Sequence, residues 1–210
     1  MAVKLQNVQP SEIEAESFKI IAREFGPSKF DDRTFKVIQR VIHATGDFAF
    51  KENMRFSHGA IEAGIKAIRA GKDIFTDVSM VASGISKGLL GNFGGSVHCM
   101  IGDRGVAAQA RAENKTRSEV AIDMALSDTI GIIAIGNAPT ALIHAVKSLA
   151  SSDPEKLPLI IGVPVGFVNA AESKELLVEQ NSCYITSLGR KGGSPVAAAI
   201  TNALIRLAAE

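Results

Sequence analysis

The chain has little of several residue types on which common protein classes depend. Its 210 residues include no tryptophan, one tyrosine and ten phenylalanines, so we expect a core that is mostly aliphatic. The only cysteines are Cys99 and Cys183, too few for the disulfide framework of a small secreted domain. We therefore expect two buried thiols and no bridge between them.

Long apolar runs and a strong charge of one sign are also missing. No run reaches the 18 or so apolar residues of a membrane-spanning helix, and the first residues contain no apolar signal core. The formal net charge is +1, whereas nucleic-acid-binding chains normally carry a strongly basic surface. Hydrophobic residues make up 46% and charged residues 21%, as in globular proteins. We expect a single cytoplasmic domain over residues 1–210 that binds neither membranes nor nucleic acid.

Three amphipathic helices are expected in the first third of the chain. Each expected start carries a capping residue, and each expected end carries a glycine. The first start also has the spacing of a capping box, from Ser11 to Glu14. The helices are expected near residues 11–26, 31–46 and 57–71, capped by Ser11, by Asp31 or Asp32, and by Ser57.

From residue 73 onward, short apolar runs alternate with helical stretches. Such alternation predicts a parallel or mostly parallel sheet with helices on both faces. The fold class is therefore α/β, three-layered, with the first helices added at the N-terminal side. The expected strands are 73–77, 97–101, 131–135, 157–163 and 183–188, and the expected helices are 117–126, 140–149, 173–180 and 195–208.

Glycine-rich polar turns follow several of these strands. Ligands of such sheets bind beyond the carboxyl ends of the strands, so these turns are the expected floor of a pocket. The turns GNFGGS (91–96) and GRKGGS (189–194) match neither a Walker A loop nor a GxGxxG fingerprint, which argues against nucleotide binding. GRKGGS places two cations before the last helix, which suits a carboxylate-rich ligand.

His43 is the candidate acid–base residue among four histidines. It shares one face of the second helix with Lys36 and Arg40, at i, i+4, i+7 spacing. That face is either a solvated cationic surface, with a histidine favoured by the helix dipole, or a proton donor beside an anion-holding arginine. No pair of histidines or cysteines has the spacing of a metal site, so no protein-bound metal is expected.

Ser17 interrupts the apolar stripe of the first helix, between Ile13 and Ile20. A buried hydroxyl needs a hydrogen-bond partner. The hydroxyl either bonds back to the carbonyl four residues earlier or binds a ligand on that face. The sequence leaves both interpretations open.

Several motifs, in order along the chain, resemble those of the precorrin-8X methylmutase family, also called precorrin isomerases or cobalt-precorrin-8 methylmutases. They extend from Ser17 to Leu204 and so cover nearly the whole chain. The motifs are Arg40 followed by 43–46 (HATG), 77–81 (DVSMV), 116–118 (TRS), 136–142 (GNAPTAL), 162–168 (GVPVGFV), 171–174 (AESK) and 189–194 (GRKGGS).

The resemblance implies an isomerase of cobalamin biosynthesis that moves a methyl group from carbon 11 to carbon 12 of precorrin-8X or its cobalt-containing counterpart. The products are hydrogenobyrinate or cobyrinate, and no cofactor is implied because the methyl group is already on the substrate. His43 matches the catalytic histidine, which protonates or hydrogen-bonds the ring C nitrogen. The resemblance also implies a homodimer with its active site near the subunit interface. Residues assigned to substrate binding are Ser17 and Arg40, and, by their place in matching motifs, Asp77, Arg117, Asn137, Lys174, Arg190 and Ser194.

The residues themselves also favour a large anionic ligand. A corrin precursor is a mostly apolar macrocycle fringed by carboxylates, which requires an aliphatic cleft with arginines and lysines around it. Two other classes remain open. One is a tetrapyrrole carrier that binds the corrinoid without converting it, which a turnover assay distinguishes. The other is a doubly wound nucleotide-dependent oxidoreductase, which lacks its fingerprint glycines here and is tested by NAD binding.

Overall fold

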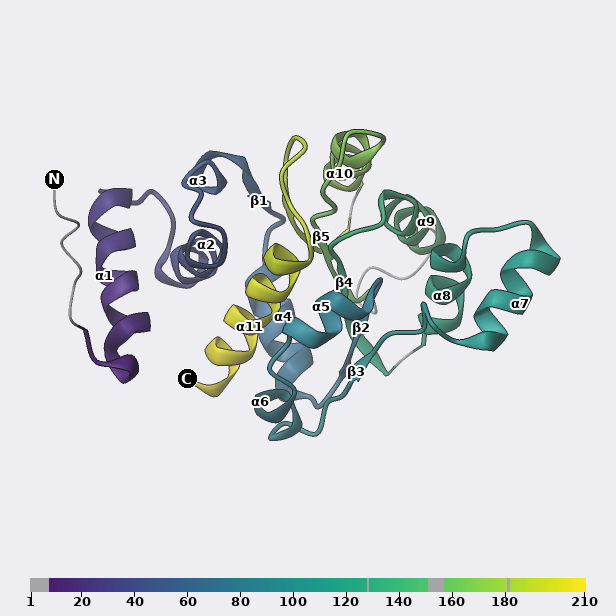
Figure 1. Ribbon diagram of the computed structural model, residues 1–210, viewed down its shortest axis with the longest axis horizontal. Coiled ribbons are helices and arrows are strands. Elements are labelled where there is room, and N and C mark those ends of the chain that lie inside the picture. The colour runs from purple at the N-terminus through teal and green to yellow at the C-terminus, as the bar shows by residue number, and fades with distance from the viewer. Residues whose placement is uncertain (1–7, 128, 151–156, 181) are drawn as a thin grey trace, which may run out of the picture.

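A six-stranded sheet forms the centre of the molecule (Figure 1). The computed structural model describes residues 8–127, 129–150, 157–180 and 182–210. The strand order is β1-β6-β5-β4-β2-β3, with β1 antiparallel to β6 and the other neighbouring pairs parallel. The strands are β1 (Met54–Phe56), β2 (Asp73–Thr76), β3 (Val97–His98), β4 (Ile130–Ile135), β5 (Leu159–Gly162) and β6 (Tyr184–Ser187).

Two groups of helices cover the two faces of this sheet, which confirms the expected three-layer α/β fold (Figure 1). The first group contains α1 (Ile13–Phe25), preceded by a 3-10 turn (Pro10–Glu12), and α2 (Asp32–Thr45), α3 (Phe50–Asn53), α4 (Ala60–Arg69), α5 (Ser79–Gly84), α6 (Lys87–Gly91) and α11 (Ser194–Ala209). The second contains α7 (Arg104–Glu113), α8 (Arg117–Ala125), α9 (Pro139–Leu149) and α10 (Ala170–Glu179).

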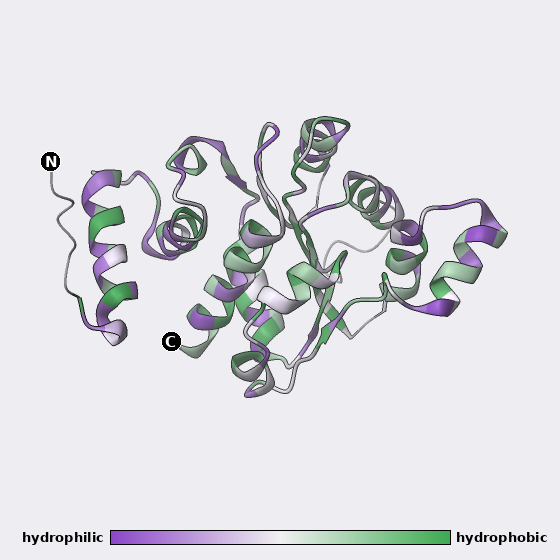
Figure 2. Ribbon diagram, viewed as in Figure 1, coloured by the Kyte–Doolittle hydropathy of each residue, from purple (hydrophilic) through white to green (hydrophobic). Residues whose placement is uncertain are grey.

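The side chains of the central strands are buried alternately against these two groups. On β4, Ile132 and Ala134 belong to the core with α2, α4 and α11, whereas Ile133 and Ile135 belong to the core with α8, α9 and α10. Successive strand residues point to opposite faces, so a strand covered on both faces is apolar throughout. Figure 2 shows this concentration of apolar residues in the strands and in α11. The core is aliphatic, as the composition predicted.

Helix starts differ from expectation at two points. Ser11 lies in the 3-10 turn and α1 begins at Ile13 without a side-chain cap, so the predicted capping box was wrong. Ser57 does not cap α4, because its hydroxyl accepts the Tyr184 backbone N–H at 2.8 Å and so extends the β1–β6 pairing. The cap of α2 is Asp31, which accepts the Thr34 N–H at 3.0 Å.

Several short elements were not predicted. They are β1, α3, α5, α6 and α7, and β3 is shorter than the expected strand 97–101. No helix among the described residues is long and apolar enough to cross a membrane. Both cysteines are free, as expected, although each is partly exposed rather than buried.

Candidate active site

His43 lies in the last turn of α2, on the surface of the molecule. Its ring packs edge-to-face on the Phe18 ring of α1, with centroids 5.2 Å apart and planes at 80°. One turn earlier, the Arg40 guanidinium lies over the same Phe18 ring, 4.9 Å from its centroid. Neither ring nitrogen of His43 is hydrogen-bonded to a residue that the structure describes, so both nitrogens are free for a ligand proton or lone pair.

Arg40 forms an ion pair with Glu14 of α1, at 2.8 Å between Nη1 and Oε1. The hydrogen bond from Arg40 holds the pKa of the Glu14 carboxyl below its usual value. Ser17 is half-buried on the same helix, and its hydroxyl donates to the Ile13 carbonyl at 2.7 Å. Of the two interpretations of Ser17, the structure of the single chain therefore shows the hydrogen bond to the carbonyl four residues earlier. Ser17, Arg40 and His43 lie on two helices that pack together.

Asp77 shapes the turn that follows β4. Its buried carboxylate accepts the backbone N–H groups of Gly136 at 3.1 Å, and of Asn137 and Ala138 at 2.8 Å each. Burial raises the pKa of the Asp77 carboxyl, while the three N–H donors oppose that rise. The carboxylate thus satisfies three donors that would otherwise be unpaired, and it leaves the Asn137 side chain exposed at the strand end.

The variant Asp77→Ala should have a free energy of unfolding about 2–4 kcal/mol lower than that of the wild type, because three backbone N–H groups lose their buried hydrogen-bond partner. The measurement is urea denaturation followed by circular dichroism. A matched control is Asp103→Ala, which removes an exposed carboxylate that accepts two N–H groups at the start of α7 and should cost about 0.5–2 kcal/mol. An equal or smaller loss at Asp77 would contradict this role.

The turn between β6 and α11 is fixed to the turn that follows β5. The Gly193 N–H donates to the Val163 carbonyl at 2.8 Å, and the Gly166 N–H donates to the Arg190 carbonyl at 3.2 Å. Gly192 is required here, since a Cβ at this position would lie 2.3 Å from the Val163 carbonyl oxygen. The Arg190 guanidinium stacks over the Phe167 ring at 5.4 Å.

Lys174 contacts the turn between β6 and α11 from the interior of the protein. Its side chain is fully buried on α10, and its ammonium donates to the Lys191 carbonyl at 2.8 Å. Burial lowers the pKa of Lys174 to about 8. The Lys174 ammonium thus meets the backbone of the turn and is covered by it.

An ion pair connects this turn to the end of α2. Lys191 Nζ lies 2.5 Å from Asp47 Oδ2, and Asp47 follows His43 by four residues. Gly46 between them takes the left-handed conformation, φ 66°, which ends the helix. The structure therefore brings the His43 helix end and the glycine-rich turns of the sheet into one region.

Ser194 and Arg117 complete the set of predicted site residues. Ser194 is the first residue of α11, and its Cα would lie 2.8 Å from a Cβ added to Gly136, so it belongs to the same edge as Asp77. Arg117 is exposed at the start of α8 and pairs with no acidic side chain among the described residues. Figure 1 shows α8 at the opposite end of the long axis from α1 and α2. One chain therefore does not bring Arg117 to His43.

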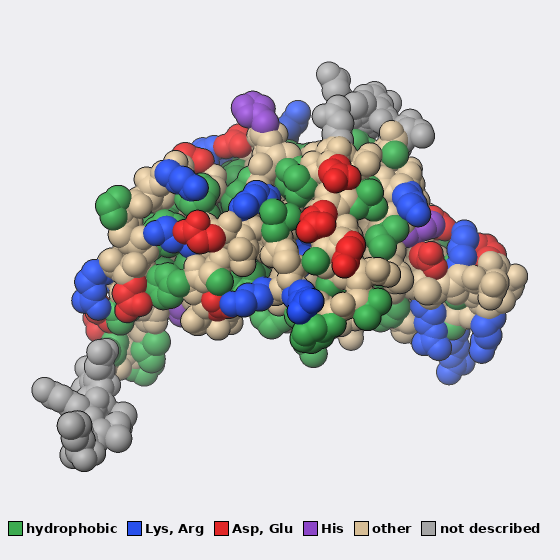
Figure 3. Space-filling model, turned by 90° about the horizontal axis from the view of Figure 1, so that it is seen from above, with side chains coloured by type: hydrophobic (Ala, Val, Ile, Leu, Met, Phe, Trp, Pro, Cys, Tyr) green, Lys and Arg blue, Asp and Glu red, His purple; other side chains and the backbone are tan. Residues whose placement is uncertain are grey.

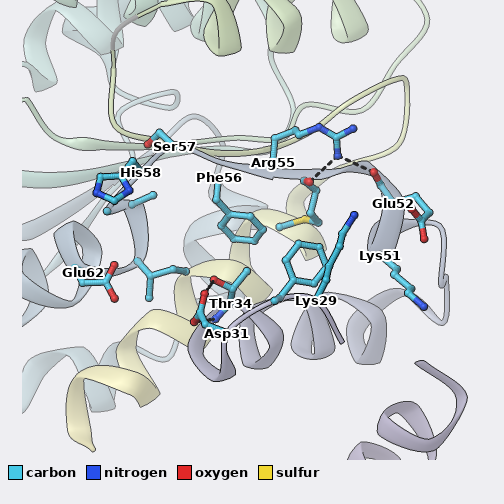
Figure 4. A pocket seen from close by; sticks show the side chains of 15 residues that line it. Lys29, Asp31, Thr34, Lys51, Glu52, Arg55, Phe56, Ser57, His58 and Glu62 are labelled. Carbon is cyan, nitrogen blue, oxygen red and sulfur yellow. Dashed lines mark hydrogen bonds between the residues drawn. The ribbon is translucent and has the colours of Figure 1, made fainter. Parts of the chain in front are cut away.

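Several hollows show where a ligand has room in the single chain, among them one of about 540 Å³ at Lys66, Gly131 and Cys183 that includes no predicted site residue. Another of about 760 Å³ lies beside β1, between the starts of α2 and α4, and is lined by Lys29, Thr34, Arg55 and His58 among others (Figure 4). It includes none of the predicted site residues. A smaller hollow of about 190 Å³ includes Arg40 and Phe18. Ligand sites usually hold about 300–1,000 Å³, so the hollow at Arg40 is too small for a macrocycle by itself.

Comparisons with known proteins identify the family. The precorrin-8X methylmutase family matches residues 12–207 of the chain. The cobalt-precorrin-8 methylmutase of Priestia megaterium is 45% identical over 202 residues, which cover 96% of this chain and 89% of that protein. The protein of the same name from Leptospira interrogans is 41% identical over 207 residues, which cover 94% of each. The chain belongs to the precorrin-8X methylmutase family.

The fold agrees with this assignment. The crystal structure of precorrin-8X methyl mutase from Thermus thermophilus aligns with a TM-score of 0.85 at 42% identity, over 94% of this chain and 98% of that one. The methylmutase family is one of isomerases that act in cobalamin biosynthesis. Membership supports the methylmutase interpretation over the carrier and the oxidoreductase.

Three contacts of this methylmutase were missed by sequence reasoning. Phe18 was missed although it adjoins Ser17, because an apolar residue on an amphipathic helix predicts only core packing, and its contact with the His43 ring is made between two helices. Glu14 was interpreted as part of a cap, and it pairs instead with Arg40. Asp47 directly follows the His43 motif, but its pairing with Lys191 spans 144 positions, and no local pattern signals it.

Proposed function

We propose that the protein converts precorrin-8X, or cobalt-precorrin-8, into its isomer by moving one methyl group from carbon 11 to carbon 12, with His43 as proton donor. The observation that carries the assignment of His43 is its ring at a helix end with both nitrogens free, held by Phe18 beside Arg40. A cytoplasmic location, expected from the sequence, forms part of the proposal.

The reaction needs little beyond one well-placed proton. One carbon–carbon bond breaks at carbon 11 and one forms at carbon 12, so substrate and product contain the same atoms. Protonation or hydrogen bonding of the ring C nitrogen by His43 draws electrons toward that ring while the methyl group migrates. The proton returns to His43 as the conjugated system is restored, and no other reactant is consumed.

Cationic side chains are proposed to hold the carboxylate fringe of the substrate. Arg40 and Arg190 carry guanidinium groups that are stacked on the aromatic rings of Phe18 and Phe167, which limits their motion. A charge-assisted bond from a guanidinium to a carboxylate is directional and strong. The apolar body of the macrocycle would lie against the exposed side chains at the same edge, Phe167, Val168 and Val165. Ser17, Asn137 and Ser194 are proposed as further contacts of the substrate.

A second copy of the chain is proposed to complete the active site. Supporting this are the separation of α2 from α8 along the long axis in Figure 1 and the small volume of the hollow at Arg40. Figure 3 looks onto the end where α3 and α10 lie, and there apolar, basic and acidic side chains are interspersed, with basic side chains gathered over α7 and α8. A two-fold dimer would place two such sites across its axis, each with Arg117 of the neighbouring chain.

The ion pair between Glu14 and Arg40 competes with a substrate carboxylate for the same guanidinium. Glu14→Gln should therefore increase product affinity about 2- to 5-fold, since breaking a partly exposed pair costs up to about 1 kcal/mol. A titration followed by the absorbance of the bound product measures this affinity. The control is Glu16→Gln on the same helix, which pairs with exposed Lys19 and should leave affinity unchanged. Equal affinities for both variants would place Arg40 outside the substrate site.

Turnover with cobalt-free and cobalt-loaded substrate, side by side, tests the proposed function. Purified protein should change the absorption spectrum of at least one of the two to that of its isomer, in proportion to enzyme and time. A spectrum that shifts at once in proportion to protein, and then stays constant, would indicate a corrinoid carrier instead. The described residues contain no cluster of three metal ligands, so cobalt is expected only as part of the substrate.

A further inference from the structure

Lys174 is an unusual residue because its charge is fully buried without a counter-charge. Its side chain is 0% exposed, and burial is the cause that lowers its pKa to about 8. No described carboxylate pairs with it, and α10 packs against α9, β6 and the turn before α11. Burial alone lowers the pKa of Lys174, and no neighbouring charge contributes to the change. The charged or titratable groups on these elements are Glu172, Glu175, Glu179, His144, Lys147, Tyr184, Arg190 and Lys191.

Such a lysine lowers stability rather than raising it. Taking an ammonium out of water costs free energy unless an opposite charge compensates, and apolar replacements of buried charges are often neutral or stabilising. Buried groups with shifted titration are concentrated at functional sites. The buried ammonium of Lys174 beside this turn therefore points to a functional role and not to a contribution to stability.

The turn that Lys174 holds carries two other cations. The Lys191 carbonyl accepts the Lys174 ammonium at 2.8 Å and the Ser187 hydroxyl at 3.1 Å. Immediately before it, Arg190 is stacked on Phe167. The Lys191 side chain itself pairs with Asp47, beside the His43 helix end. The Lys191 carbonyl thus holds a turn that carries both Arg190, the proposed anion-binding residue, and the Lys191 side chain that pairs with Asp47 near His43.

We propose that Lys174 is a positioning residue of the methylmutase reaction: through the Lys191 carbonyl it fixes the turn 189–193 and gives it a positive potential that favours a substrate carboxylate at Arg190. This inference rests on the proposed function. In this proposal Lys174 does not contact the substrate, as the sequence had suggested, but acts on it through the turn 189–193.

Proton uptake is the signature that a merely structural lysine would not give. An anion bound at the turn stabilises the ammonium and raises the pKa of Lys174 from its value of about 8. If the rise is about one unit, product binding near pH 8.5 takes up roughly half a proton per site. Near pH 6.5 the ammonium is already charged, and Lys174 contributes no uptake.

Calorimetric titration with hydrogenobyrinate, in two buffers of different ionisation enthalpy, measures this uptake in the wild-type protein. Lys174→Met should abolish the uptake and raise KM about tenfold, while kcat changes less than about threefold. Ser187→Ala removes a neutral donor from the same carbonyl and is the matched control. It should retain the uptake.

The outcomes separate this inference from the function on which it rests. A wild-type protein that neither binds nor converts corrinoid overturns both together. A wild-type protein that turns substrate over but takes up no proton near pH 8.5 overturns the role of Lys174 alone, and this result needs no variant to fold. The same conclusion follows if Lys174→Met keeps the KM and the proton uptake of the wild type.

Discussion

His43→Ala should lose at least two to three orders of magnitude in the rate of methyl migration, the usual scale for general acid–base catalysis. The imidazole supplies the proton for the ring C nitrogen, and no other described histidine lies on α1 or α2 to replace it. Product affinity should change little, since the carboxylate contacts are made by arginines. Single-turnover absorbance kinetics and product titration measure the two quantities separately.

The control for this variant is His58→Ala, which removes an exposed histidine beside the cavity at β1. It should retain the wild-type rate. Because His43 packs on Phe18 at the surface, its removal should not unfold the protein, and circular dichroism checks this. A His43→Ala protein that keeps more than about a tenth of the wild-type rate would contradict the assignment of the proton donor.

Mixing His43→Ala chains with Arg117→Ala chains should restore activity at low substrate concentration if active sites are shared between chains. Arg117→Ala should weaken product affinity about 10- to 150-fold, from the loss of a charge-assisted bond of roughly 1.5–3 kcal/mol. In a hybrid dimer with His43→Ala, one site then contains both intact residues and the other contains neither. Random mixing should restore about a quarter of the wild-type activity at low substrate concentration.

The reciprocal experiment uses a chain with both substitutions. Mixed with wild-type chains, it should leave every hybrid dimer with almost no activity at low substrate concentration, because one site lacks His43 and the other lacks Arg117. If His43 and Arg117 act within one chain, the single variants restore nothing and each hybrid with the double variant keeps one working site. A light-scattering mass of a single 22.1 kDa chain at micromolar concentration would exclude the shared site altogether.

The sheet could be predicted from the sequence because its signals are local. The aliphatic runs of β4 and β5 and the glycines at their ends follow from burial on both faces and from tight turns. The edge strand β1 was missed since three residues, Met54–Phe56, show no period. Its pairing with β6 depends on residues more than a hundred positions away.

The candidate site was predictable in its residues but not in their partners. Asp77 and Asn137 were both expected at the substrate and lie in contact after β2 and β4, yet the sequence did not show that the Asp77 carboxylate accepts backbone N–H groups. Lys174 was expected at the ligand, and burial places it beneath a turn. Such assignments depend on which groups a side chain meets in three dimensions, and polar residue types alone do not determine that.

The most direct test of the account follows the methyl group itself. Precorrin-8X carrying ¹³C in the methyl group at carbon 11 is incubated with the protein and observed by NMR. The labelled signal should move to the position of a methyl group on carbon 12. When substrate that also carries a second label in its ring is mixed with unlabelled substrate, no product with only one of the two labels should form. A signal that stays on carbon 11 while the protein binds the substrate would contradict the methylmutase assignment.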